Sequence, residues 1–236
     1  MVPHADVQDS PVTIREYVRD PARTIFIGVP TLGLVSIHWH GHISQLKAPM
    51  NRSLRHAYIV GREVGEARNL IVNQALGFRG ALGERASHVL FLDDDVLIPP
   101  DALIDLLALN RPIIAGLYYG KTPTAQPLVL HDEYEGLLTQ WTPGEVVECS
   151  GHGMGCTLIQ VSVFREVWAR HHVTVSTECC PMCSGAAQAE PCAGCFGTGH
   201  VIEFFRTTRQ SLVNAAGVAV MVHQTEDVYF LAAARE

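Results

Sequence analysis

The sequence predicts an α/β fold, with a mainly parallel sheet flanked by helices and a small cysteine-rich insertion. Apolar runs of strand length alternate with segments of helical period through the first half of the chain. Hydrophobic residues make up 47% and charged residues 17% of the 236 residues, which is enough to bury a large core. The formal net charge of -7 argues against general nucleic-acid binding. No apolar run approaches the roughly 18 residues that a membrane-spanning helix needs.

The first half of the chain supplies strands and a helix in alternation. Thr24–Val29 predicts a strand that the following proline ends, whereas residues 31–56 show no clear period. Ala57–Val60 is a second short apolar run. Apolar residues at helical spacing predict a helix over Val64–Phe78, and the continuous run Val89–Leu92 predicts a strand buried on both faces.

The alternation continues beyond this buried strand. Two prolines open a predicted helix over Asp101–Leu109, because proline is tolerated in a first turn. Pro112–Leu117 is strand-like, and Val146–Cys149 is a further short strand. Cys156–Val161 and Val163–Ala169 predict another strand and helix. Strands and helices at this spacing predict parallel pairing with right-handed crossovers.

The ends of the chain and one internal segment differ from this pattern. Residues 1–22 are polar and broken by prolines, which predicts a loose lead-in before a domain of residues 23–236. Residues 173–205 read as an insertion within that domain. Val218–Val222 then resumes as a strand, and Asp227–Ala234 predicts a closing helix. The N-terminus has no apolar core of a secretory signal, so we expect a cytoplasmic protein with reduced thiols.

The insertion carries two CxxC pairs, formed by Cys180 with Cys183 and by Cys192 with Cys195. Each CxxC turn can present two thiolates to one tetrahedral Zn²⁺, and four thiolates leave no open position for catalysis. The pairs therefore predict a structural zinc site, and their pattern resembles the zinc modules of the DnaJ type. A redox pair or free thiols are the alternatives. The insertion holds no Lys or Arg, which argues against nucleic-acid binding there.

Three consecutive carboxylates, Asp93, Asp94 and Asp95, directly follow the buried strand at Val89–Leu92. The carboxyl ends of strands in an open α/β sheet are where ligands bind. Side chains alternate along an extended chain, so we expect Asp93 and Asp95 to point the same way. Two such carboxylates suit Mg²⁺ or Mn²⁺, with phosphate and water completing the shell. The alternative is a solvated acidic loop before a helix.

Six short stretches occur in a fixed order: IGVPT (Ile27–Thr31), VGEARN (Val64–Asn69), HVLFLDDDVLIPPDAL, RPIIAGLYYGK, GHGMGCTL (Gly151–Leu158) and TEDVYF (Thr225–Phe230). In this order they resemble the motifs of GT-A fold glycosyltransferases of the broad family 2 group, and they cover most of residues 24–231. The acidic triplet resembles the DXD motif of these enzymes. The resemblance implies a GT-A, Rossmann-like fold for the domain.

The resemblance also implies roles for residues near the first and third strands. Asp95 would bind the divalent metal on the diphosphate of a nucleotide-sugar. Asp93 and Asp94 would be shared between metal, ribose and sugar. Pro30 and Thr31 lie where the family seats the nucleotide base, although Thr31 equally suits a turn hydroxyl.

Two further motifs of the resemblance carry charged residues. Arg68, near a helix N-terminus, would assist in holding the diphosphate, or would pair with Glu63 or Glu66 as a surface arginine. Asp227 resembles the aspartate that deprotonates the acceptor hydroxyl in inverting members, with Glu226 in support. The alternative for this pair is a capping role at the start of the helix.

Two segments rich in glycine and tyrosine complete the implied site. Gly153, Met154 and Gly155 resemble the family segment beside the donor sugar and acceptor, or form a bulge without a ligand. Tyr118 and Lys121 form a second donor-facing patch, with packing as the alternative reading for the tyrosine.

The sequence as a whole predicts a metal-dependent glycosyltransferase with Mn²⁺ or Mg²⁺ at the DXD motif and a structural Zn²⁺ in the insertion. Its donor would be a nucleotide-diphosphate sugar, with UDP or GDP favoured. Glycan, lipid, protein and modified nucleic acid stay open as acceptors. A nucleotidyltransferase of related fold is an alternative, but its Gly-rich, Lys/Arg-containing phosphate loop is not found near the first strand. A non-catalytic domain that acts through its zinc module is another.

Overall fold

The computed structural model of the chain describes residues 22–121, 125–132, 136–171, 173–186, 190–213 and 219–235. The predicted lead-in lies outside these residues, apart from Ala22. Among the described residues, every helix is too short or too polar to span a bilayer.

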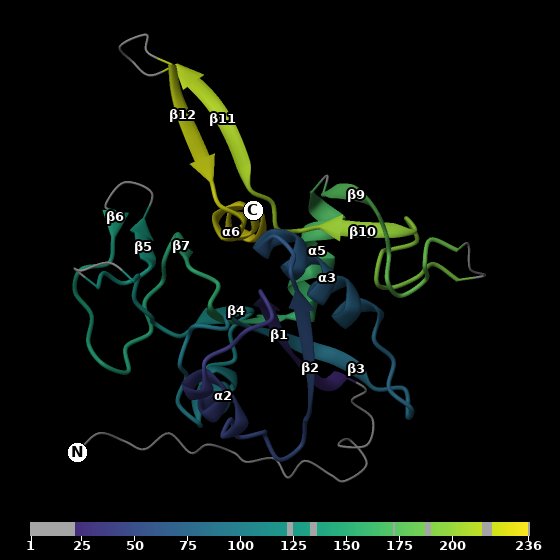
Figure 1. Ribbon diagram of the computed structural model, residues 1–236, viewed down its shortest axis with the longest axis horizontal. Helices are drawn as coiled ribbons and strands as arrows, with labels where there is room; N and C mark the ends of the chain where they lie inside the picture. The colour runs from purple at the N-terminus through teal and green to yellow at the C-terminus, as the bar shows by residue number, and fades with distance from the viewer. Residues whose placement is uncertain are drawn as a thin grey trace, which may run out of the picture.

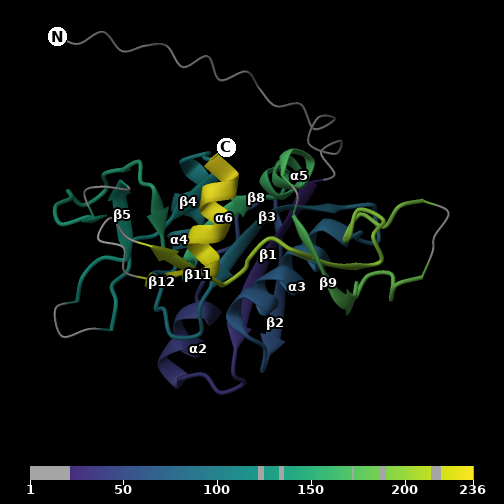
Figure 2. The same ribbon diagram turned by 90° about the horizontal axis from the view of Figure 1, so that it is seen from above.

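A mixed five-stranded sheet forms the centre of the molecule, in the order β2-β1-β3-β8-β4 (Figures 1 and 2). The strands are β1 (Ala22–Thr31), β2 (Ser53–Val60), β3 (Arg85–Leu92), β4 (Ile113–Ala115) and β8 (Cys156–Gln160). β1 pairs in parallel with β2 and β3, whereas β8 is antiparallel to both β3 and β4. Four strands therefore run in one direction and β8 in the other.

One face of the sheet packs against α3 (Val64–Gly77), α5 (Val161–Arg170) and α6 (Glu226–Arg235). Phe26, Phe91 and Ile159 point to this face and pack on the apolar residues of these helices. Gly28 of β1 has no side chain to hold α3 away, because a Cβ there would lie 2.5 Å from Ile71 Cγ2. This close approach sets α3 directly beside the carboxyl ends of the strands.

The opposite face packs against α2 (Ile37–Ser44) and α4 (Ala102–Ala108). Ile27, Leu90 and Leu158 alternate with the residues of the first face and bury their side chains here. Trp39 of α2 joins this second core at 2% exposure. Burial on both faces explains why the predicted strand at β3 reads as a continuous apolar run.

The predicted elements of the central sheet and its helices are confirmed, with shifts of a few residues at their ends. β1 does not end at Pro30, which lies opposite Ile59 of β2. β3 pairs with β1 only as far as Gly28, so Pro30 has a strand on one side only, where proline is tolerated. The helix α2 was not predicted, because its segment lacks a clear hydrophobic period.

Two predicted strands differ in the structure. The expected strand at Val146–Cys149 is wrong, since these residues are irregular, and the paired strand is β7 (Gly151–His152). β7 joins β5 (Val129–Asp132) and β6 (Gly136–Leu137) in a small separate sheet. The strand expected at Val218–Val222 corresponds to β12 (Ala219–Gln224). It pairs with β11 (Thr208–Val213) in a hairpin that projects from the body, outside the central sheet (Figure 1).

The predicted insertion forms an antiparallel pair around the cysteines. β9 (Thr174–Cys179) leads into the cysteine segment and β10 (His200–Glu203) leads out of it. β10 packs against α3, and the chain then runs through Phe204 and Phe205, which are buried in the first core. The insertion is thus attached to the helix that borders the strand ends.

Candidate functional site

The acidic triplet lies at the carboxyl end of β3, where the chain turns. Val96 N donates to Asp93 O at 3.1 Å, so residues 93–96 form a turn and not an extended segment. The expectation that Asp93 and Asp95 share a direction rested on an extended chain, and it does not apply here. Each of the three carboxylates instead has a different partner.

Arg68 joins the triplet to the start of α6. Its Nη2 donates to Asp93 Oδ1 at 2.9 Å and its Nη1 to Glu226 Oε1 at 2.5 Å. The arginine side chain is 3% exposed, and its guanidinium also lies over the Phe91 ring. Arg68 thus pairs with Asp93 and Glu226 and not with the neighbouring Glu63 or Glu66. Its Nε is buried without a hydrogen-bond partner among the described residues, and its role toward a diphosphate stays a prediction.

Burial raises the pKa of Asp93 and of Glu226, and the Arg68 guanidinium acts in the opposite direction on both groups. Asp94 and Asp95 raise the pKa of Asp93 further. One guanidinium thus faces the buried Glu226 and the partly exposed Asp93, with two more acids next to Asp93. This local excess of negative charge favours a further cation at the strand end.

The other two acids of the triplet contact neighbouring loops. Thr31 Oγ1, at the end of β1, donates to Asp94 Oδ2 at 2.6 Å and accepts from Gly33 N at 3.0 Å. Asp95 is half exposed and pairs with the Lys121 ammonium group. Thr31, expected at the nucleotide base, and Lys121, expected in a donor-facing patch, both lie at the triplet, whereas Pro30 is buried in the sheet.

Tyr118 packs against the glycine segment and Asp93. Its hydroxyl accepts from Gly155 N at 2.8 Å, and Asp93 N donates to Gly155 O at 3.0 Å. A Cβ on Gly153 would lie 2.2 Å from the Tyr118 hydroxyl, so this residue must be glycine for the ring to pack here. Burial raises the pKa of Tyr118 to about 12 and keeps the phenol neutral.

Met154 does not belong to this surface. Its side chain is 1% exposed and lies in the core beneath α5 and α6. The expectation that Met154 contacts a substrate is wrong for the side chain, because the bend between β7 and β8 turns Met154 into the core. Only the glycine side of this segment faces the triplet.

Asp227 and Glu226 have separate surroundings although they are adjacent. Glu226 is buried on Arg68, whereas Asp227 is partly exposed. Asp227 Oδ1 accepts from the Thr225 hydroxyl and from Val228 N, the latter at 2.9 Å, and Asp227 lies in the first turn of α6. α6 packs against β7, and the charge of Asp227 acts to raise the pKa of Tyr118 and of His152.

Sequence reasoning missed two residues at this site. Trp39 Nε1 donates to Asp93 O at 2.9 Å and holds the turn of the triplet from the opposite face of the sheet. His152 on β7 is half-buried, and its Nδ1 lies 2.9 Å from Gly153 O. The tryptophan lies in a segment without periodicity, and the histidine is a single residue among glycines, so neither carried a distinct signal.

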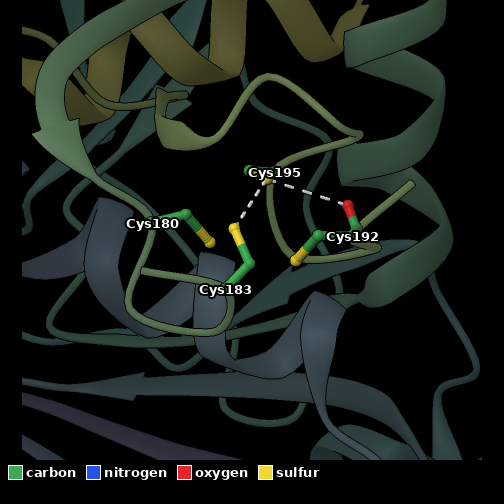
Figure 3. A group of neighbouring side chains, drawn as sticks. All are labelled: Cys180, Cys183, Cys192 and Cys195. Carbon is green, nitrogen blue, oxygen red and sulfur yellow. Dashed lines mark hydrogen bonds between the residues drawn. The ribbon is translucent and has the colours of Figure 1, made fainter. Parts of the chain in front are cut away.

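The four cysteines of the insertion converge on one point (Figure 3). The Sγ atoms of Cys180, Cys183, Cys192 and Cys195 all lie within 4.8 Å of one another. Cys183 Sγ and Cys195 Sγ are 3.8 Å apart. A tetrahedral zinc with Zn–S bonds of about 2.3 Å requires sulfur atoms about 3.8 Å apart. The cluster can therefore hold a structural metal such as zinc.

The two CxxC turns have the same backbone form. In each, the two residues after the second cysteine take positive φ values: 52° and 73° at Ser184 and Gly185, and 49° and 84° at Phe196 and Gly197. Burial raises the pKa of the Cys180 thiol to about 12, while the N–H groups of the turn lower it. A metal cation would favour the thiolates that burial disfavours.

Two buried asparagines attach the insertion to α3. Asn69 Nδ2 donates to Phe205 O and its Oδ1 accepts from Phe205 N, both at 2.8 Å. Asn73 bonds both main-chain groups of Ile202 in the same way, at 3.2 Å. Met182 fills the space above Gly77, where a Cβ would lie 2.6 Å from its Cγ. One helix thus carries Arg68 at the carboxylates and the asparagines at the cysteine module.

No protein-family model matches the chain, and no curated protein sequence matches it. A functional assignment therefore depends on the sequence motifs and on the geometry described above.

Proposed function

We propose that this protein is a GT-A-like, metal-dependent glycosyltransferase that moves a sugar from a nucleotide-diphosphate donor to an acceptor hydroxyl. The proposal is carried by one observation: the acidic triplet at the end of β3 and the Glu226–Asp227 pair are brought together through Arg68. The resemblance of the ordered motifs supports a donor at the triplet, and the partly exposed Asp227 directly follows the Glu226 that Arg68 joins to Asp93. Thr31 and Tyr118 border the same place.

The residues of the triplet fit a hard divalent cation. Asp93, Asp94, Asp95 and Glu226 supply four carboxylates against the two cations Arg68 and Lys121. Among the described residues, only the cysteines form a group of three or more ligating side chains close enough to share a metal. The aspartates would therefore bind Mn²⁺ or Mg²⁺ together with donor phosphates, as these ions commonly are bound.

Asp95 and the free oxygen of Asp93 would hold this cation, which when bound would neutralise charge on the leaving diphosphate. In the proposed reaction, the bond between the anomeric carbon and the diphosphate oxygen breaks, and its electron pair leaves with the nucleoside diphosphate. The acceptor oxygen bonds to the same carbon, and Asp227 takes the hydroxyl proton. Glu226 and Arg68 act as positioning residues, since their groups are engaged with each other.

The cysteine cluster has a separate role in this proposal. We assign it a structural Zn²⁺, because four thiolates fill a tetrahedral shell and leave no position for a substrate. Its attachment to α3 through Asn69 and Asn73 supports a role in holding the helix that carries Arg68.

The proposal is tested by thermal shift with UDP, GDP, CDP, dTDP and ADP, each with and without Mn²⁺. A donor nucleotide at a hundredfold excess over its Kd should stabilise the fold by about 2.7 kcal/mol. Asp95→Ala should abolish the Mn²⁺-dependent shift. Asp105→Ala, which removes an exposed acid on α4, should leave it unchanged. An absence of any nucleotide shift, or an equal shift in Asp95→Ala, contradicts the proposal.

A second measurement tests the base. Asp227→Asn should bind donor nucleotide as the wild type does. Transfer should fall about 10²- to 10⁴-fold, the usual contribution of a general base. Donor hydrolysis without an added acceptor serves as the activity assay while the acceptor is unidentified, with water as the nucleophile. Near-normal turnover in Asp227→Asn would exclude the base role and leave donor binding intact.

A further inference from the structure

A cavity of about 580 Å³ lies beside the carboxylate site, on the open edge of the central sheet. Its floor is β4 with the residues that follow it, 113–117. Its walls come from residues 138 and 141 and from segment 145–152, and Leu231, Ala234 and Arg235 of α6 close one side. The floor belongs to the RPIIAGLYYGK stretch and residues 151 and 152 to GHGMGCTL, whereas the other wall residues belong to no motif.

Asp227 is not itself a lining residue, but it precedes the α6 residues that line the cavity. Leu231 and Ala234 follow Asp227 by four and seven residues, so all three lie on one face of α6. His152 lines the cavity, and α6 packs against its strand β7. The floor residue Leu117 directly precedes Tyr118, which contacts the glycine segment. The cavity therefore leads along α6 to the carboxylate assigned as the base.

The lining has an apolar character with hydrogen-bonding groups along one side. Leu117, Leu138, Trp141 and Leu231 supply apolar surface, and Trp141 is 37% exposed. Gly116 N and Pro112 O form hydrogen bonds with β8. Because the main-chain groups of successive residues in a strand face opposite sides, those of residues 113 and 115 face away from β8, toward the open edge of the sheet. The volume is within the range of sites that bind small organic molecules.

We infer that this cavity is the acceptor site, and that it takes a small alcohol with an apolar or aromatic body whose hydroxyl reaches Asp227. The inference rests on the proposed transferase function. The body lies against Leu117, Trp141 and Leu231, and its polar groups bond to the free edge of β4. Apolar side chains supply much of the lining, and the charged residues Arg111, Glu145, Glu148 and Arg235 also border the cavity. A free monosaccharide lacks the apolar part that this lining selects.

The experiment uses the full chain and two probes, 4-nitrophenyl β-D-glucoside and n-octyl β-D-glucoside below its micelle concentration, with glucose as the polar control. Saturable binding of a probe, at least tenfold tighter than that of glucose, is expected, together with faster consumption of the donor identified by thermal shift. Leu117→Trp fills the cavity and should weaken probe binding at least tenfold. Leu82→Trp, at a loop position 91% exposed, is the matched control and should change nothing.

Measuring nucleotide binding in the same variants separates this inference from the proposed function. Mn²⁺-dependent nucleotide binding should be equal in the wild type and in Leu117→Trp. Normal nucleotide binding without binding of either probe would overturn the acceptor site while the transferase proposal stands. The same conclusion follows if Leu117→Trp leaves the affinity for the probes unchanged. Probe binding that fails to accelerate donor consumption overturns it equally. Failure of every nucleotide to bind the wild type contradicts the transferase itself.

Discussion

The cysteine cluster and the carboxylate site are built in opposite ways. The four cysteines lie within one short segment, and their own sulfur atoms form the buried centre of the module. Arg68, by contrast, contacts carboxylates that are 25 and 158 residues away in the sequence. The first site depends on local turns and a metal, and the second on the packing of the whole sheet. This difference predicts which changes will disturb one site and spare the other.

The largest effect should follow the loss of one zinc ligand. A structural zinc site contributes on the order of 10 kcal/mol of apparent binding free energy near pH 7. Cys180→Ser should therefore remove zinc from the purified protein, as measured by elemental analysis, and lower the melting temperature. Its neighbour Cys179, an exposed thiol outside the cluster, gives the matched control Cys179→Ser, which should keep about one zinc per chain. Full zinc content in Cys180→Ser would contradict the assignment of Cys180 as a zinc ligand.

The next effect is expected at the long-range ion pairs. Arg68→Met leaves the buried Glu226 and the partly exposed Asp93 without their cation, which should cost up to about 3–5 kcal/mol of unfolding free energy. Arg62 also pairs with two glutamates, but it is 45% exposed. Arg62→Met should therefore cost at most about 1 kcal/mol. Urea unfolding of both variants measures the contrast, and equal losses would show that burial does not set the strength of the Arg68 pairs.

A smaller effect should appear where the two sites are linked. Asn73→Ala leaves the main-chain N–H and C=O of Ile202 without a partner, which costs about 1–3 kcal/mol for each group. Because Ile202 belongs to the strand that leaves the cysteine segment, this variant should also release zinc to a chelator faster than the wild type. Gln45→Ala, which removes an exposed bond to Gly41, is the control. Unchanged zinc release in Asn73→Ala would show that the module is energetically independent of α3.

The smallest effect concerns pH, to which the two sites should respond in opposite directions. The pKa of Asp93 is raised above 3.8, so its contribution to stability is full below that pH and is lost as pH rises through the folded pKa. The stability advantage of the wild type over Asp93→Asn should therefore shrink as pH rises above about 4. Zinc binding instead weakens as pH falls, since the thiols must be deprotonated. A wild-type stability advantage that grows with pH would mean that Arg68 lowers the pKa of Asp93 by more than burial raises it.

Local patterns in the sequence determined the elements and the metal cluster. The apolar run at Val89–Leu92 and the helical period from Val64 predict β3 and α3, because burial on a sheet or helix imposes a period on adjacent residues. The two CxxC pairs predict the cluster for a similar reason, since each pair forms its own turn. The acidic triplet was likewise placed at a strand end, which the structure confirms.

The tertiary structure alone decided which side chains meet. Arg68 had candidate partners within its own helix, yet it bonds to Asp93 and Glu226 because α3 lies close on β1 and its arginine points toward the strand ends. Met154 lies among glycines in the sequence but in the core in the fold. Contacts across the chain depend on how whole elements pack, and no period or spacing within one segment records that packing.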